Sequence, residues 1–104
     1  MKITEVKIFS VNEERLKAYV TITIEGCFVV RDLKIIQGPG GLFVAMPSKK
    51  RKDGQFRDIA HPLNQETREK LEDQIFEVYE NELRSMGATL TSLKRQKATQ
   101  SYQG

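Results

Sequence analysis

The sequence has little of the chemistry on which disulfide-bonded, exported or membrane-spanning proteins depend. Its 104 residues include one cysteine, Cys27, and one histidine, His61. A single cysteine excludes a disulfide framework within the chain, and we expect Cys27 to be a buried thiol. No apolar run is long enough to cross a bilayer, and the first residues alternate like a strand and lack the apolar core of a signal peptide. We therefore expect a cytoplasmic protein with no membrane insertion.

Candidate catalytic groups are also scarce. A metal or catalytic centre needs several converging ligands or partners, and His61 has only Asp58 nearby in the sequence. We interpret His61 as a structural residue at a strand-to-helix junction. The run Gly38–Gly41 lacks the spacing of a phosphate-binding loop and is interpreted as a hairpin turn. The sequence thus predicts no catalytic residue, no metal and no cofactor, and argues against an enzyme.

Charged residues are abundant, and they are distributed unevenly along the chain. The net charge is only +3, but residues 62–84 are acidic and lie between a basic segment, 47–61, and a basic C-terminal segment, 85–104. The chain is 38% hydrophobic and 30% charged, which suits one globular domain. Two basic segments can meet a polyanion, or they can neutralise the acidic segment within the fold or between subunits.

Period-two alternation predicts most of the strands. It is clearest in Leu16–Glu25, where β-branched residues dominate, and Lys2–Ser10 is a second strand with an irregularity near Val6. These two strands are expected to form an antiparallel hairpin. Further strands are predicted over Lys34–Gln37, Leu42–Met46 and Phe56–Ala60. For Phe28–Leu33 the pattern permits either a strand or a helical turn.

One amphipathic helix is predicted from about Gln65 to Ser85. Apolar residues recur there at three- and four-residue steps, Asn64 is a good N-cap, and Gly87 is a stop signal. The fold class is therefore α+β: a small antiparallel sheet of four to five strands followed by one C-terminal helix. Residues 1–87 form the single domain and residues 88–104 a basic, polar tail. Because one helix covers only part of the sheet, we expect a homodimer formed through strand edges.

The strongest candidate site is a basic loop. Residues Ser48–Gln55 include no apolar side chain and carry Lys49, Lys50, Arg51 and Lys52, with Arg57 just beyond. Four consecutive cations repel one another, and phosphate contacts would relieve that repulsion. A solvated loop without a partner is the alternative. Phe43 and Phe56 flank the loop; we interpret both as core residues, although an exposed one could stack on a base.

Several stretches resemble the stage V sporulation protein G (SpoVG) family of septation proteins. They are Met1–Val6, Gly41–Lys50, Phe56–Leu63 and Thr67–Lys70, and the resemblance covers roughly residues 1–84. The resemblance implies a bacterial regulator of sporulation, asymmetric septation and gene expression that binds DNA or RNA. It also implies a dimer assembled through strands, and it assigns Lys49, Lys50, Arg51 and Arg57 to nucleic-acid binding. Lys52 is added from charge alone.

A second class of function stays open beside nucleic-acid binding. The acidic helix or an exposed strand edge would suit an adaptor that docks a cell-division or regulatory protein. A partner that survives nuclease treatment and mutation of the basic loop, but is lost when Glu72, Asp73 and Glu80 are changed, would favour this alternative. The sequence names neither a target sequence nor a preference for DNA or RNA.

Overall fold

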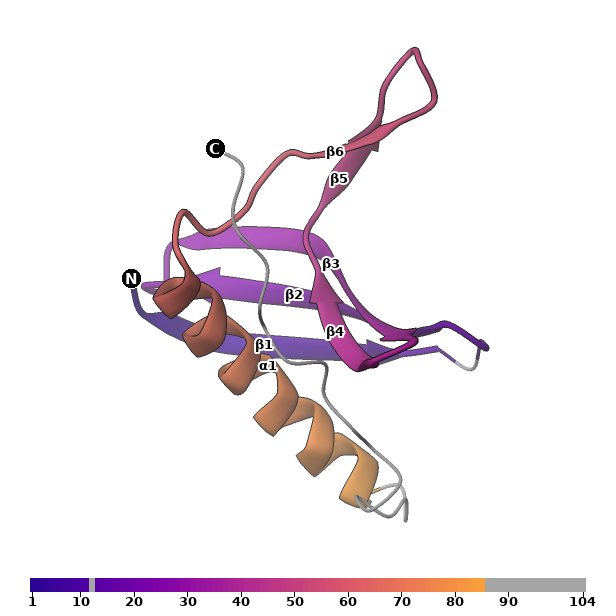
Figure 1. Cartoon of the computed structure of the whole chain (residues 1–104). Coiled ribbons are helices and arrows are strands. Elements are labelled where there is room, and N and C mark those ends of the chain that lie inside the picture. The colour runs from indigo at the N-terminus through magenta and orange to yellow at the C-terminus, as the bar shows by residue number, and fades with distance from the viewer. Residues whose placement is uncertain (12, 86–104) are drawn as a thin grey trace.

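The computed structural model describes residues 1–11 and 13–85, in which strands precede a single long helix (Figure 1). Four strands form the main antiparallel sheet in the order β1-β2-β3-β4. They are β1 (Ile3–Ser10), β2 (Leu16–Ile24), β3 (Phe28–Gly38) and β4 (Gly41–Ala45). The predicted α+β class is confirmed, as are the hairpin of the first two strands and the turn between Gly38 and Gly41.

Alternation along β2 sorts its side chains between the two faces of the sheet. Ala18, Val20 and Ile22 are buried, whereas the intervening Tyr19 is exposed. In β1 the pairing register shifts between Ile3 and Glu5, close to the irregularity predicted near Val6. A shift of this kind is a β-bulge, which accommodates one unpaired residue and bends the strand.

Phe28–Leu33, which the sequence left open, is strand and forms the first part of β3. The turn before it has positive φ at Glu25 (50°) and Gly26 (68°), as in the two-residue turns that suit the twist of a β-hairpin. A second register shift lies opposite Asp32, whose φ is 65°. Aspartate tolerates this left-handed conformation better than most residues.

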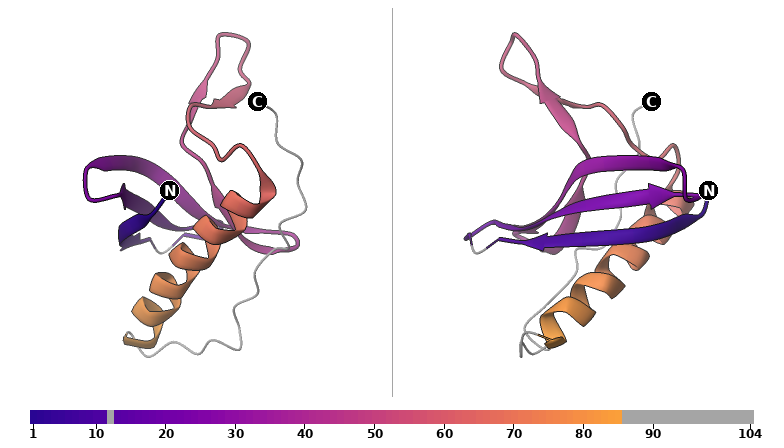
Figure 2. Two further views of the ribbon diagram at one scale, coloured as in Figure 1. Left: turned by 90° about the vertical axis from the view of Figure 1, so that its left-hand side faces the viewer. Right: turned by 180° about the vertical axis from the view of Figure 1, so that it is seen from behind.

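Two short strands, β5 (Ser48–Lys50) and β6 (Phe56–Asp58), form a separate antiparallel hairpin that projects from the body (Figures 1 and 2). The expectation of a loop over Ser48–Gln55 is wrong for its first residues, and the strand expected over Phe56–Ala60 is shorter. Both faces of this hairpin are exposed to water. Such strands lack apolar alternation, which is the signal that predicts a strand.

The helix α1 (Gln65–Ser85) has the bounds that the sequence predicts. Asn64 caps it, because its Oδ1 accepts a hydrogen bond from the Thr67 backbone N–H at 2.8 Å. Leu71, Ile75, Phe76 and Tyr79 are buried and join the core formed by the inward side chains of the main sheet. The expected stop at Gly87 and the tail 88–104 lie outside the described residues.

The helix crosses one face of the main sheet and leaves the opposite face uncovered (Figure 2). The most deeply buried large side chains come from three strands and the helix. They are Val20, Leu33, Ile35, Leu42, Val44 and Ile75. Among the described residues, no helix combines the length and apolar character that a membrane crossing requires.

Candidate nucleic-acid interface

The cations of the predicted basic loop lie on the projecting hairpin, residues 48–58, which we call the basic hairpin. Its register places Lys49 directly opposite Arg57 and Lys50 opposite Phe56. Like charges directly opposite each other destabilise a pair of strands. The structure therefore brings four predicted cations and Arg57 together on one small element, where they repel one another.

A tight turn closes the basic hairpin and places its remaining cations at the tip. The Gly54 N–H donates to the Arg51 carbonyl at 3.0 Å, and the Arg51 N–H donates to the Gln55 carbonyl at 2.7 Å. Gly54 has φ of 87°, which suits glycine, and the Asp53 carboxylate accepts a hydrogen bond from the Gln55 N–H at 3.0 Å. Asp53 thus shapes the turn, and Lys52 lies at its tip.

Exposure and charge make this element available to an anion. Every residue from Ser48 to Ile59 is exposed. Five of them are cations, and only Asp53 and Asp58 are acidic. The ion pairs found within residues 1–11 and 13–85 join Glu5 to Lys7, Arg68 to Glu72 and Glu66 to Lys70, so none of them involves the hairpin. The hairpin therefore carries a local positive charge that faces solvent.

Apolar side chains follow the same element. Phe56 is 70% exposed, and Ile59 and Leu63, in the segment leading to α1, are similarly exposed. The interpretation of Phe56 as a core residue is wrong, because the hairpin stands away from the body. Phe43 lies outside the core cluster and is half-buried. An isolated two-stranded hairpin is only marginally stable in water.

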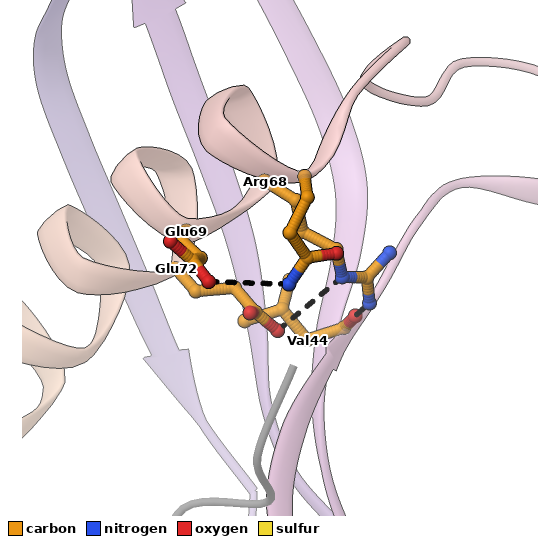
Figure 3. A network of polar contacts seen from close by, with 5 residues as sticks. Val44, Arg68, Glu69 and Glu72 are labelled. Carbon is orange, nitrogen blue, oxygen red and sulfur yellow. Dashed lines mark hydrogen bonds and ion pairs between the residues drawn. The ribbon is translucent and has the colours of Figure 1, made fainter. Parts of the chain in front are cut away.

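The strand β4, which leads into the basic hairpin, is joined to the start of α1 (Figure 3). The Arg68 guanidinium donates a hydrogen bond to the Val44 carbonyl at 2.7 Å and forms an ion pair with Glu72 at 3.6 Å. Val44 is in β4, the strand that leads into the hairpin. One turn earlier on the helix, the Gln65 side chain donates to the Glu69 carboxylate at 3.3 Å. Arg68 is therefore a structural cation, unlike those of the hairpin.

The sequence suggests that the carboxylates of α1 form a solvent-facing acidic surface, but the structure shows that one of them is buried. Glu72 is only 4% exposed, since it pairs with Arg68 against the sheet. Asp73, Glu77 and Glu82 are exposed. Glu72 is therefore not part of the helix surface that a protein partner could contact. The periodicity of the sequence alone does not predict that Glu72 is more buried than the other carboxylates.

The other candidate residues, His61 and Cys27, do not form a catalytic or metal site within the described residues. His61 is half-buried and lies between β6 and α1, as expected for a residue at a strand-to-helix junction. Its Nδ1 lies 2.9 Å from the Pro62 carbonyl oxygen. In the part of the chain that the structure describes, no three His, Cys, Asp or Glu side chains come together as a metal site would need. Cys27 is exposed in the turn before β3, so the expectation of a buried thiol is wrong.

A small cavity, which the sequence does not reveal, lies between the sheet and the start of α1. Its volume is about 140 Å³, and Ile22, Leu33, Met46 and Leu71 are among the side chains that line it. His61 and Thr67 are also on its wall, but the lining is almost wholly apolar. A catalytic pocket needs convergent polar groups, and this cavity lacks them.

Comparison with known proteins places the chain in a family. The model of the SpoVG family matches residues 1–81. A protein of Bdellovibrio bacteriovorus named "Putative septation protein SpoVG" is 77% identical over 104 residues, which is 100% of this chain and 96% of that protein. Proteins of the same name from Anaeromyxobacter sp. (strain K) and Myxococcus xanthus are 65% and 60% identical, over 85% and 80% of this chain and 87% and 84% of theirs. The chain belongs to the SpoVG family.

Proposed function

We propose that this chain is a cytoplasmic regulator that binds DNA or RNA through the basic hairpin and thereby influences gene expression, sporulation and asymmetric septation. The observation that carries the proposal is the exposed hairpin with Lys49 opposite Arg57. The name that its relatives bear connects the chain with septation. Phosphates are the anions that such a repeating set of cations fits, because each contact also releases condensed counterions.

The proposed mode of binding is contact with phosphates, with little direct reading of sequence. The basic hairpin is short and presents lysine and arginine, whereas α1 carries seven acidic residues and suits no groove of a duplex. Lys49, Lys50, Arg51, Lys52 and Arg57 are the proposed phosphate contacts. Modest sequence preference and strong dependence on salt follow from this assignment.

The test is a fluorescence-anisotropy titration of labelled DNA and RNA. The hairpin variant replaces Lys49, Lys50, Arg51 and Lys52 with glutamine. The matched control replaces Lys2, Arg15, Lys70 and Arg84 with glutamine, which lowers the net charge equally but leaves the hairpin intact. We expect the hairpin variant to bind at least about tenfold more weakly, and the control to bind nearly as wild type. Equal weakening in both variants would show that net charge, and not the hairpin, determines binding.

We propose further that the active species is a homodimer assembled through strands. The edge strands β1 and β4 and the exposed Phe56, Ile59 and Leu63 support this, because unpaired edges and apolar side chains gain from a second copy. A dimer would present two basic hairpins, and two linked contacts bind a long polyanion more tightly than one. Light scattering should give about twice the 11.9 kDa of the chain. A persistent monomer at micromolar concentration would contradict the dimer.

The adaptor function is the second candidate. Asp73, Glu77 and Glu80 recur along α1 at four- and three-residue steps; Asp73 and Glu77 are exposed and Glu80 is half-buried. The experiment is a pull-down from cells with nuclease present, using wild type, the hairpin variant and a variant with these three residues changed to Asn or Gln. A protein partner that survives nuclease and the hairpin changes, but no longer binds after the helix changes, would favour the adaptor.

A further inference from the structure

The face of the main sheet that α1 leaves open carries an aromatic pair. In β1, Val6 and Ile8 pack against the core, so Phe9 lies on the opposite face. In β2, Ala18 and Val20 are buried, and Tyr19 lies on the same open face as Phe9. Phe9 is 55% and Tyr19 40% exposed. This open face is turned toward the viewer on the right of Figure 2.

The pairing register places the two rings in a row of four residues, one from each strand of the main sheet. Phe9 is the partner of Tyr19, Tyr19 is the partner of Lys34, and Lys34 is the partner of Ala45. Residues directly opposite on one face have Cβ atoms roughly 5 Å apart, so the two rings are neighbours. The row ends at Ala45, close to Ser48, where the basic hairpin begins.

Lysines surround the aromatic pair. Lys34 is next to Tyr19 in the row, and Lys7 lies two residues from Phe9 on the same face of β1. Lys17 lies two residues before Tyr19, at the register shift between Leu16 and Ala18. Two acidic residues lie beside them: Glu5, whose carboxylate is 3.9 Å from the Lys7 ammonium, and the exposed Asp32, two residues before Lys34. The Lys17 ammonium donates to the Glu13 carbonyl, a neutral acceptor, at 2.9 Å. The surroundings of the rings are therefore net positive.

Two rings flanked by lysines match an unpaired nucleic-acid strand. Bases that are free of a partner stack on aromatic side chains, and lysines contact the phosphates between them. A duplex keeps its bases stacked inside and cannot use the rings. A second copy of this chain fits less well, because a two-fold axis through this face would bring its lysines against the same lysines. A cross-strand contact between the rings would stabilise the β1–β2 hairpin, but it does not account for the lysines.

We propose that Phe9 and Tyr19, with Lys7, Lys17 and Lys34, form a platform that stacks unpaired bases of single-stranded DNA or RNA. This inference rests on the proposed function, since the basic hairpin holds the backbone of the same strand. It deepens that function by naming the substrate class: single strands bind to the hairpin and the platform, whereas duplexes bind to the hairpin alone.

The first experiment uses a fluorescent reporter in the platform. The chain contains no tryptophan, so Phe9→Trp introduces the only one. As a control, Phe28→Trp introduces one at another exposed site, the start of β3 opposite Ile24. We expect oligothymidine to quench the Phe9→Trp fluorescence and a mixed-sequence duplex to leave it nearly unchanged. The Phe28→Trp signal should respond to neither. Equal quenching by strand and duplex, or in both variants, would overturn the platform.

The second experiment compares affinities. The platform variant, Phe9→Leu with Tyr19→Leu, keeps apolar bulk in the strands but removes both aromatic rings. We expect its affinity for oligothymidine to fall at least about tenfold and its affinity for duplex to change by less than about twofold. The hairpin variant should bind both probes weakly. Weak binding of both probes by the hairpin variant, with no change in the platform variant, would overturn the platform and leave the proposed function standing. Wild-type protein that bound neither probe would overturn both.

Discussion

The Arg68 guanidinium on α1 donates a hydrogen bond to the backbone carbonyl of Val44 on β4 at 2.7 Å, while its Nε pairs with the buried Glu72. This contact joins the start of the helix to the strand that leads into the basic hairpin. The strand before the hairpin is therefore held against the helix, whereas the residues of the hairpin itself are exposed.

Removing Arg68 should destabilise the whole domain. Arg68→Met leaves the Glu72 carboxylate buried without this cation, and we expect the free energy of unfolding to fall by about 3 kcal/mol. Urea denaturation measures the change. The control Lys70→Met breaks an exposed ion pair with Glu66 and should have little effect. The double variant Arg68→Met with Glu72→Leu should recover much of the stability; no recovery would argue against the pair as the cause.

The packing of α1 on the sheet predicts a larger cavity effect at Ile75 than at any exposed helix position. Ile75 has no exposed surface, so Ile75→Ala should lower the free energy of unfolding by about 2–5 kcal/mol. Glu77→Ala, on the exposed surface of the same helix, should change it by less than about 0.5 kcal/mol. Denaturant titrations of both variants decide this, and similar small effects in both would mean that α1 contributes little to the core.

Tyr79 predicts a specific decrease in stability at alkaline pH. Burial raises the pKa of the Tyr79 hydroxyl above its ordinary value of 10.0. Below about pH 10 the folded and unfolded states both keep the proton; above it the unfolded chain loses the proton first, so stability falls. Urea denaturation should give the free energy of unfolding of wild type and of Tyr79→Phe from neutral to alkaline pH. The difference between the two should be constant below about pH 10 and should shift in favour of the phenylalanine variant above it. A difference independent of pH would contradict this.

The basic hairpin should open independently of the body. Gly54 has φ of 87°, with no atom near the position of an added Cβ, so Gly54→Ala strains only the backbone of the turn, by about 1 kcal/mol. Hydrogen exchange should show faster exchange of the Arg51 and Gly54 amides, with core amides of β2 unchanged. Faster exchange throughout the sheet would instead mean that the hairpin and the body unfold as one unit.

The sequence predicts those elements in which one face is buried. β2 alternates because Ala18, Val20 and Ile22 meet the core. The helix α1 has the expected bounds because buried residues recur along it and Asn64 caps it. The cations of the site are equally visible, since charge needs no tertiary structure to be recognised. Family resemblance and the family match agree on the same part of the chain.

Features that depend on long-range contacts are not predicted. Glu72 is buried only because Arg68 reaches β4, a contact between residues far apart in the chain. Phe56 is exposed because the hairpin projects, whereas its apolar character suggests burial. The pairing of Phe9 with Tyr19 and Lys34 depends on the register of these strands, which shifts at three places. Alternation shows which face a residue occupies, but not which residues lie beside it.

The salt dependence of nucleic-acid binding tests the central claim most directly. Removing one cation that binds a phosphate should reduce the slope of log affinity against log salt concentration by roughly 0.7 for single strands and 0.9 for duplexes. The hairpin variant, with Lys49 to Lys52 changed to glutamine, should therefore show a less steep slope than wild type. Its magnitude should be smaller by about three to four if all four cations bind phosphates. The control with Lys2, Arg15, Lys70 and Arg84 changed should keep the wild-type slope. Equal slopes for the wild type and the hairpin variant would contradict the assignment of the basic hairpin as the nucleic-acid interface.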